Sequence, residues 1–240
     1  MSDSLHILNS QPLTAMIELL KYVTVGRGLF VVPFAPTSIF VPSRLLNKNS
    51  KIVGTPAPAI TVAFCPSLFS LNPLRMLPLW SVKGIFTFLT TLLKPKSVGT
   101  MCLASADPRA WPDVQLGYLS NPEDYIPLQK CVRLALRLAE QMRAQGYPLK
   151  DLLVPETEND ADMDRFIRAN LRTSYHYSST CRMAREVEGG VVDDDLRVYG
   201  VQGLRVCDTS VFPEIVATHT MAPAVVVAEK CADLIKATWR

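Results

Sequence analysis

Three histidines are the side chains of this sequence best suited to proton transfer, because imidazole changes its charge near neutral pH. They are His6, His176 and His219. His6 lies close to the N-terminus, where an exposed side chain is expected. The other two stand in the unusual segments SYHYSSTCRM and ATHTMAP. The simplest alternative for each is a histidine that only packs or makes hydrogen bonds within a loop.

Acidic and thiol side chains offer weaker candidates for chemistry. Asp193–Asp195 are three consecutive acids whose side chains would point in different directions, so a solvated turn is expected and no metal site is predicted. None of the six cysteines forms a C-x-x-C pair, which argues against zinc. Cys181 and Cys207 lie near the histidine segments in sequence, but small buried apolar side chains are the expected role for both.

From His176 onward the chain holds an ordered series of short motifs. These are TCRM at 180–183, LRVYGVQGLRV at 196–206, DTS at 208–210, HTMAP at 219–223 and AEKCADLI at 228–235. The series resembles the C-terminal signature of the glucose–methanol–choline (GMC) oxidoreductases, and it is far more specific than any single short motif. Segments 105–108 and 118–124 resemble the substrate-domain pattern of that family.

The resemblance implies oxidation of an alcohol by hydride transfer to FAD. By this likeness His176 is the expected proton acceptor, a role that suits a group with a pKa near the working pH. His219 is expected to hold the substrate oxygen. Together the two side chains would orient one C–H bond for transfer.

The same resemblance implies four cofactor contacts. Asp208 and Thr209 match the stretch that touches the ribityl chain of the flavin, and Thr220 and Met221 match the helix start beside the flavin ring. Pro223 is predicted as the first helical residue, with Ala222 as the N-cap and the helix N–H groups free for an anionic ligand.

Several features depart from the family pattern. Tyr177, Ser179 and Thr209 stand where the family has proline, glycine and alanine. The sequence holds no G-x-G-x-x-G fingerprint, and the pair Gly26 and Gly28 is expected to lie in a plain loop. A truncated or fragmentary family member without the N-terminal Rossmann unit is therefore expected, and the missing FAD-domain chain is one partner it could have.

The predicted fold class is mixed α/β (α+β). It comprises an antiparallel substrate-domain sheet with flanking helices, plus a C-terminal strand–helix piece of an FAD-binding domain. The expected domains are an incomplete substrate-binding (cap) domain at 1–170 and the C-terminal segment at 171–240.

Apolar periodicity and turn residues place the individual elements. Helices are predicted at 12–24, 127–144, 160–171 and from 223 onward, and a buried or cap-type helix at 76–93. That last segment carries Lys83 at its middle, which speaks against an integral membrane span. Strands are predicted at 97–105, 114–119, 196–199 and 204–207, and 29–66 is interpreted as loop with short strands.

Composition sets broad limits on function. The chain has 240 residues, of which 48% are apolar and 20% charged, as in ordinary folded proteins. A net charge of +3 without a basic run predicts no nucleic-acid partner. The first residues lack the features of a signal peptide, so an intracellular location with reduced cysteines is expected.

Three functional hypotheses remain open on sequence alone. The first is a GMC-type enzyme that oxidises a small primary or aryl-type alcohol. Secondary metabolism is one pathway type in which such an enzyme would act. The second is an FAD-free remnant that uses His176 and His219 as an acid–base pair in isomerisation, dehydration or cyclisation. The third is an interaction protein that binds through surfaces normally packed on the rest of such an enzyme.

Overall fold

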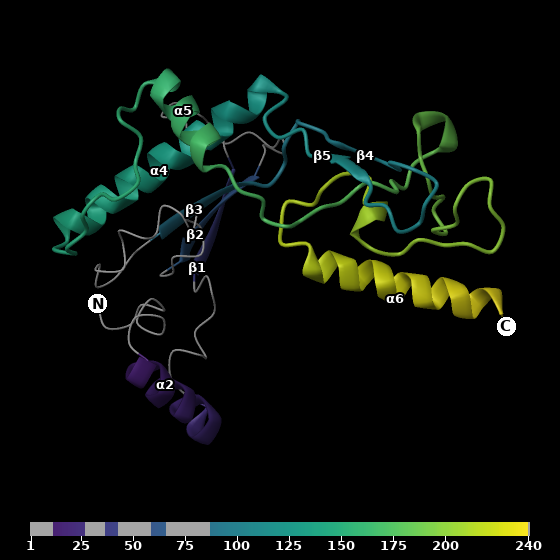
Figure 1. The fold of residues 1–240 in the computed structure, drawn as a ribbon, viewed down its shortest axis with the longest axis horizontal. Coiled ribbons are helices and arrows are strands. Elements are labelled where there is room, and N and C mark those ends of the chain that lie inside the picture. Colours follow the sequence, from purple (N-terminus) through teal and green to yellow (C-terminus); the bar gives the residue numbers. More distant parts are fainter. Residues whose placement is uncertain (1–11, 27–36, 43–58, 66–86, 240) are drawn as a thin grey trace. The chain divides into compact units, whose positions relative to one another are not determined.

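The computed structural model describes residues 12–26, 37–42, 59–65 and 87–239 (Figure 1). The chain forms two compact units, each built from two separate stretches of sequence. Unit 1 comprises Met1–Leu92 and Tyr125–Arg172, and unit 2 comprises Leu93–Asp124 and Thr173–Arg240.

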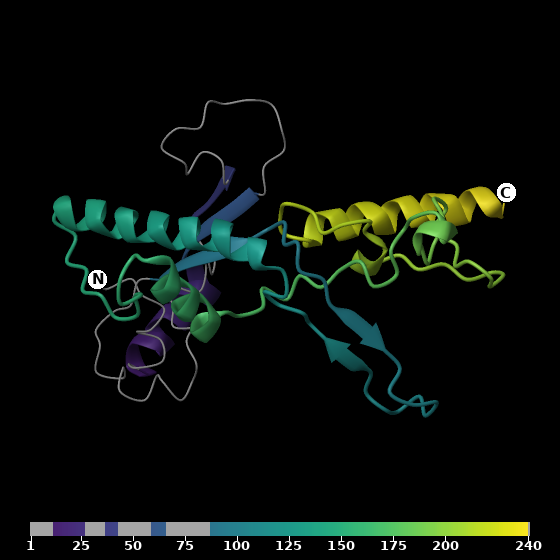
Figure 2. The same cartoon turned by 90° about the horizontal axis from the view of Figure 1, so that it is seen from above.

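Unit 1 combines a three-stranded antiparallel sheet with helices. The strands β1 (Thr37–Pro42), β2 (Ala59–Cys65) and β3 (Thr87–Leu92) pair in the order β1-β2-β3. The helices are α2 (Pro12–Val25), α4 (Tyr125–Ala144) and α5 (Asp160–Asn170). Helix α4 contacts β2, β3 and α5, as the two ribbon views show (Figures 1 and 2). The mixed helix-and-sheet class and its small antiparallel sheet are confirmed.

Helix α4 forms because its apolar residues recur at three- and four-residue spacing. Leu128, Cys131 and Ala135 are buried on that stripe. Burial raises the pKa of the Cys131 thiol to about 12, so this thiol stays protonated and unreactive. The Gln129 amide, next to buried Leu128, donates to Asp164 of α5 at 2.8 Å.

The sequence predicted three of these helices well and one segment wrongly. The predictions at 12–24, 127–144 and 160–171 are confirmed by α2, α4 and α5. The helix predicted at 76–93 is wrong where it overlaps β3, and residues 76–86 lie outside the described residues. Thr87, Thr90 and Thr91 are β-branched and pair with β2, which favours a strand there.

Unit 2 begins with a two-stranded antiparallel ribbon. Strands β4 (Thr100–Cys102) and β5 (Asp113–Gln115) confirm the predicted strand pair, although both are shorter than expected. A glycine is required at the base of the ribbon. A Cβ atom on Gly99 would lie 2.3 Å from the Gln115 carbonyl oxygen, closer than any side chain tolerates. The short helix η5 (Pro122–Asp124) then leads out of this stretch.

The second stretch of unit 2 is mostly irregular and ends in the long helix α6 (Met221–Thr238), drawn in yellow in Figure 1. Short 3-10 turns occur at Glu186–Glu188 (η6) and Thr209–Val211 (η7). The core of this stretch consists of five buried side chains. They are Val192, Leu196, Val211, Phe212 and Cys231.

The strands predicted at 196–199 and 204–207 are absent as regular strands from this part of the described chain. Isolated bridges join Arg197 to Arg205 and Val192 to Val198 instead. Leu196 has a φ of 63°, a left-handed conformation that interrupts any extended run. The Asp193 carboxylate also accepts the backbone N–H groups of Asp195 and Arg197, which closes the turn predicted for the three acids.

Among the described residues, no helix is both long and apolar enough to cross a lipid bilayer. Within the same ranges, no group of three or more histidine, cysteine or acidic side chains is placed to hold a metal ion.

Candidate active site

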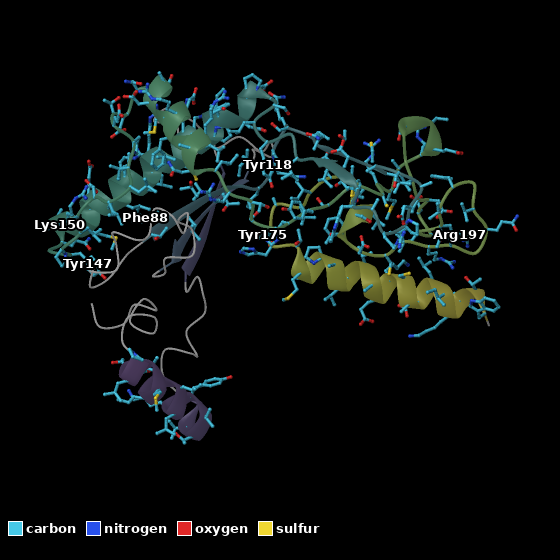
Figure 3. The ribbon with its side chains drawn as sticks, viewed as in Figure 1. Phe88, Tyr118, Tyr147, Lys150, Tyr175 and Arg197 are labelled. Atoms are coloured by element: carbon cyan, nitrogen blue, oxygen red, sulfur yellow. The ribbon has the colours of Figure 1, made fainter. Side chains whose placement is uncertain are left out.

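The loop that carries His176 is held in an unusual backbone conformation. Tyr175 and Ser179 flank the histidine with φ values of 60° and 68°, both in the left-handed region. Figure 3 labels the exposed Tyr175 side chain. Such a conformation costs a residue with a side chain roughly 1–2 kcal/mol. Ser179 stands where the GMC pattern has glycine, and the left-handed backbone gives the physical reason for a glycine at that position.

Hydrogen bonds tie this loop to the segment around η7. The Ser179 amide donates to the Thr209 carbonyl at 3.2 Å, and the Cys181 amide donates to the Ser210 carbonyl at 2.9 Å. In return, the Thr209 hydroxyl donates to the Tyr177 carbonyl at 2.9 Å. These contacts, all on the C-terminal side of His176, hold its loop against the unit 2 core, in which Val211 is fully buried.

The second element of the site is the N-terminus of α6. Thr220 is the N-cap residue and Met221 the first helical residue, so the prediction of Ala222 as N-cap and Pro223 as first residue is wrong by two positions. Proline is still accommodated because the first-turn N–H positions have no partner within the helix. The Thr220 side chain makes no capping hydrogen bond to the helix N–H groups.

The two elements meet in a short chain of hydrogen bonds. Thr220 Oγ1 lies 2.9 Å from His176 Nδ1, and His176 Nε2 lies 2.9 Å from His219 Nδ1. The two imidazole rings meet edge to face, with centroids 5.2 Å apart and an interplanar angle of 75°. Thr220 is buried, His176 is half-buried and His219 is exposed.

The electrostatics of the pair favour a neutral His176. Burial lowers the pKa of His176 below its ordinary value of 6.5, and the positive charge of a protonated His219 lowers that pKa further. Since an N···N hydrogen bond needs one N–H and one lone pair, one ring must offer a free nitrogen to the other. The pair can therefore accept a proton at neutral pH.

We expect His176 to titrate below pH 6.5 in the folded chain. The His219→Gln substitution removes the nearby positive charge that contributes to this lowering, so it should raise the titration midpoint of His176. Since unfolded His176 binds protons at a higher pH than folded His176, stability should fall as the pH drops from 6.5 toward the lowered midpoint. NMR titration of the ring protons measures the midpoint. A wild-type midpoint above 6.5 would contradict the assignment.

Among the other predicted site residues, Asp208 and Thr209 use their side chains in contacts within unit 2. The Asp208 carboxylate caps η7 by accepting the Ser210 amide at 2.7 Å. The Thr209 hydroxyl is bonded to Tyr177, and the Met221 side chain is exposed. Flavin contacts by Asp208, Thr209, Thr220 and Met221 stay predictions, and they would fall mainly to backbone groups.

Sequence reasoning missed the contact between Thr220 and His176. A threonine before a helix ordinarily accepts an N–H of the first turn, so nothing in the local pattern indicates a partner 44 residues away. The histidines themselves were found through the motif series, but their direct hydrogen bond was not.

Comparison with known proteins places these features in a family. The family model described as GMC oxidoreductase matches residues 95–228. The oxygen-dependent choline dehydrogenase of Rhizobium rhizogenes is 37% identical over 142 residues, which cover 58% of this chain and 26% of that protein. The mitochondrial choline dehydrogenase of Mus musculus is 38% identical over 146 residues, which cover 60% and 24%. The chain thus spans about a quarter of the length of these curated relatives.

Solved structures share the fold. The formate oxidase of Aspergillus oryzae RIB40 superposes with a TM-score of 0.75 at 24% identity, over 93% of this chain and 42% of that one. The pyridoxine 4-oxidase from Mesorbium loti gives a TM-score of 0.68 at 21% identity, over 84% and 39%. With the family model matching more than half of its residues, the chain belongs to the GMC oxidoreductase family, whose cofactor is FAD.

Proposed function

We propose that unit 2 carries the proton-transfer machinery of an FAD-dependent alcohol oxidation, with His176 as the base and His219 as the group that holds the substrate oxygen. The observation that carries the proposal is the 2.9 Å contact between the two imidazoles at the start of α6. A base that stays neutral near pH 7 and a neighbouring hydrogen-bond donor are the groups that removal of a hydroxyl proton requires.

The residues at the start of α6 suit an electron-rich flavin ring. The Thr220 hydroxyl is directed to His176 instead of the helix, so side-chain capping does not occupy the N–H groups of Met221 and Ala222. Free N–H groups and the positive end of the helix dipole stabilise negative charge. FAD, when bound, would supply the acceptor for the hydride of the alcohol.

The roles of the two histidines follow from which atoms face each other. His176 Nδ1 is engaged by Thr220, which leaves Nε2 as the nitrogen that can accept a proton. A substrate hydroxyl entering between the rings would donate to His176 Nε2 and accept a hydrogen bond from His219. The direct His–His contact would open at that step, and the substrate would replace it with two hydrogen bonds.

The substrate class we propose is a small primary or aryl-type alcohol. The relatives support this range by name: two are choline dehydrogenases, and one structural neighbour is a pyridoxine 4-oxidase. A fungal aryl-alcohol oxidase is 30% identical, with a TM-score of 0.58 over 78% of this chain.

The test is a visible absorption spectrum of the 240-residue chain after incubation with FAD and gel filtration. We expect retained flavin bands that bleach under anaerobic conditions when choline, pyridoxine or benzyl alcohol is added. A matched His176→Gln sample should retain the bands and bleach far more slowly. A colourless folded chain, or bound flavin that none of the alcohols reduces, would contradict the proposal for these residues.

A further inference from the structure

Thr220 is a buried hydroxyl residue at a helix start that makes no contribution to capping that helix. Only 7% of its surface is exposed, and its backbone has φ −79° and ψ −12° rather than the extended conformation usual for an N-cap. Its oxygen lies 2.9 Å from His176 Nδ1 instead. The hydroxyl therefore couples the start of α6 to the loop that carries His176.

Two hydrogen-bond arrangements fit the observed distances. In the first, His176 carries its hydrogen on Nδ1 and donates it to Thr220, while Nε2 accepts from the Nδ1–H of His219. In the second, His176 carries the hydrogen on Nε2 and donates it to His219, while Nδ1 accepts from the threonine hydroxyl. Only the first leaves a lone pair on Nε2, the nitrogen that faces His219.

We infer that Thr220 is a positioning residue that holds His176 as the Nδ1–H tautomer and so keeps Nε2 available as the base. The hydrogen bond made by one ring nitrogen sets the state of the other, and a buried partner also fixes the plane of the ring. The inference rests on the proposed function, because that function requires a free lone pair on Nε2.

The direct test is the ring tautomer of His176 in the flavin-free chain, read from long-range ¹H–¹⁵N NMR spectra at a pH well above its midpoint. The sequence contains three histidines, so His6→Gln and His219→Gln variants assign the signals. We expect the wild type to carry the hydrogen on Nδ1. Thr220→Val, which keeps the shape without the hydroxyl, should move most of the population to Nε2–H, and Thr220→Ser should retain the wild-type state.

Kinetics of the flavin-loaded protein give a second reading. Thr220→Val should lower kcat about 100-fold, the size of effect that a misplaced catalytic group produces. KM should stay within about threefold, because the threonine makes no contact with the substrate in this scheme. Thr220→Ser keeps the hydroxyl and should therefore recover most of the rate. A purely structural defect at the helix start does not predict this recovery.

The outcomes separate this inference from the function on which it rests. A wild-type Nε2–H tautomer, or an unchanged tautomer in Thr220→Val, overturns the role of Thr220 even in an active enzyme. The expected tautomers in a chain that oxidises none of the alcohols support the role of Thr220 and contradict the proposed function. Should Thr220→Val unfold, the tautomer of the wild type and of Thr220→Ser still decides the inference.

Discussion

Replacing His176 with glutamine is expected to slow reduction of the bound flavin by an alcohol about 10²- to 10⁴-fold, the usual contribution of a general base. Glutamine fills much of the same space and can still bond to Thr220 and His219, but it cannot accept a proton near neutral pH. Stopped-flow measurement of the flavin band under anaerobic conditions gives the rate directly.

Two matched variants sharpen this experiment. His6→Gln removes the histidine to which no catalytic role is assigned and should leave the rate unchanged. His219→Gln keeps a hydrogen-bond donor for the substrate oxygen, so its loss should be smaller than that of His176→Gln. A His176→Gln rate within a few-fold of wild type would show that another group takes the proton.

Replacing Asp124 with alanine is expected to lower the free energy of unfolding by about 3 kcal/mol, because it leaves two backbone N–H groups without their charged acceptor. Asp124 is 2% exposed, and its two oxygens accept the amides of Lys96 and Ser97 at 2.7 and 2.9 Å. These bonds close the base of the β4–β5 ribbon. Urea unfolding followed by circular dichroism measures the change.

Glu123 supplies the control for this prediction. It is the neighbouring acid, and it pairs with the Lys96 side chain at an exposed position. An exposed ion pair contributes about 0–1 kcal/mol, so Glu123→Ala should have a small effect. Equal losses for the two alanine variants would show that the buried carboxylate has no special role in unit 2.

The sequence predicts the helices of this protein better than its irregular segments. Local apolar spacing decides α4 and α5, and both were located to within about two residues, the usual precision at helix ends. The predicted start of α6 was too late because proline favours the first helical position, which made Ala222 the expected N-cap. Thr220, two residues earlier, takes that position while its hydroxyl serves His176.

Segments whose structure depends on distant partners were harder to predict. The apolar stretch that ends in β3 has no period that separates a buried helix from a strand, and pairing with β2 decides between them. A turn from Asp193 to Arg197 replaces the start of the strand predicted at 196–199. It forms because the Asp193 carboxylate accepts hydrogen bonds from the backbone amides of Asp195 and Arg197. The two histidines could be named from motifs, whereas their contact across 43 residues comes only from the folded chain.

The interleaving of the two units has a consequence for handling and synthesis of the protein. The backbone passes from unit 1 to unit 2 and back before it enters unit 2 for the last time, after Arg172. No single deletion or proteolytic cut can therefore release either unit free of sequence that belongs to the other. During synthesis, the ribbon of β4 and β5 leaves the ribosome long before α6. The early part of unit 2 therefore cannot complete its fold until the C-terminal stretch has been made. A chain shortened to end after Arg172 would keep both stretches of unit 1 and would leave residues 93–124 without the rest of unit 2.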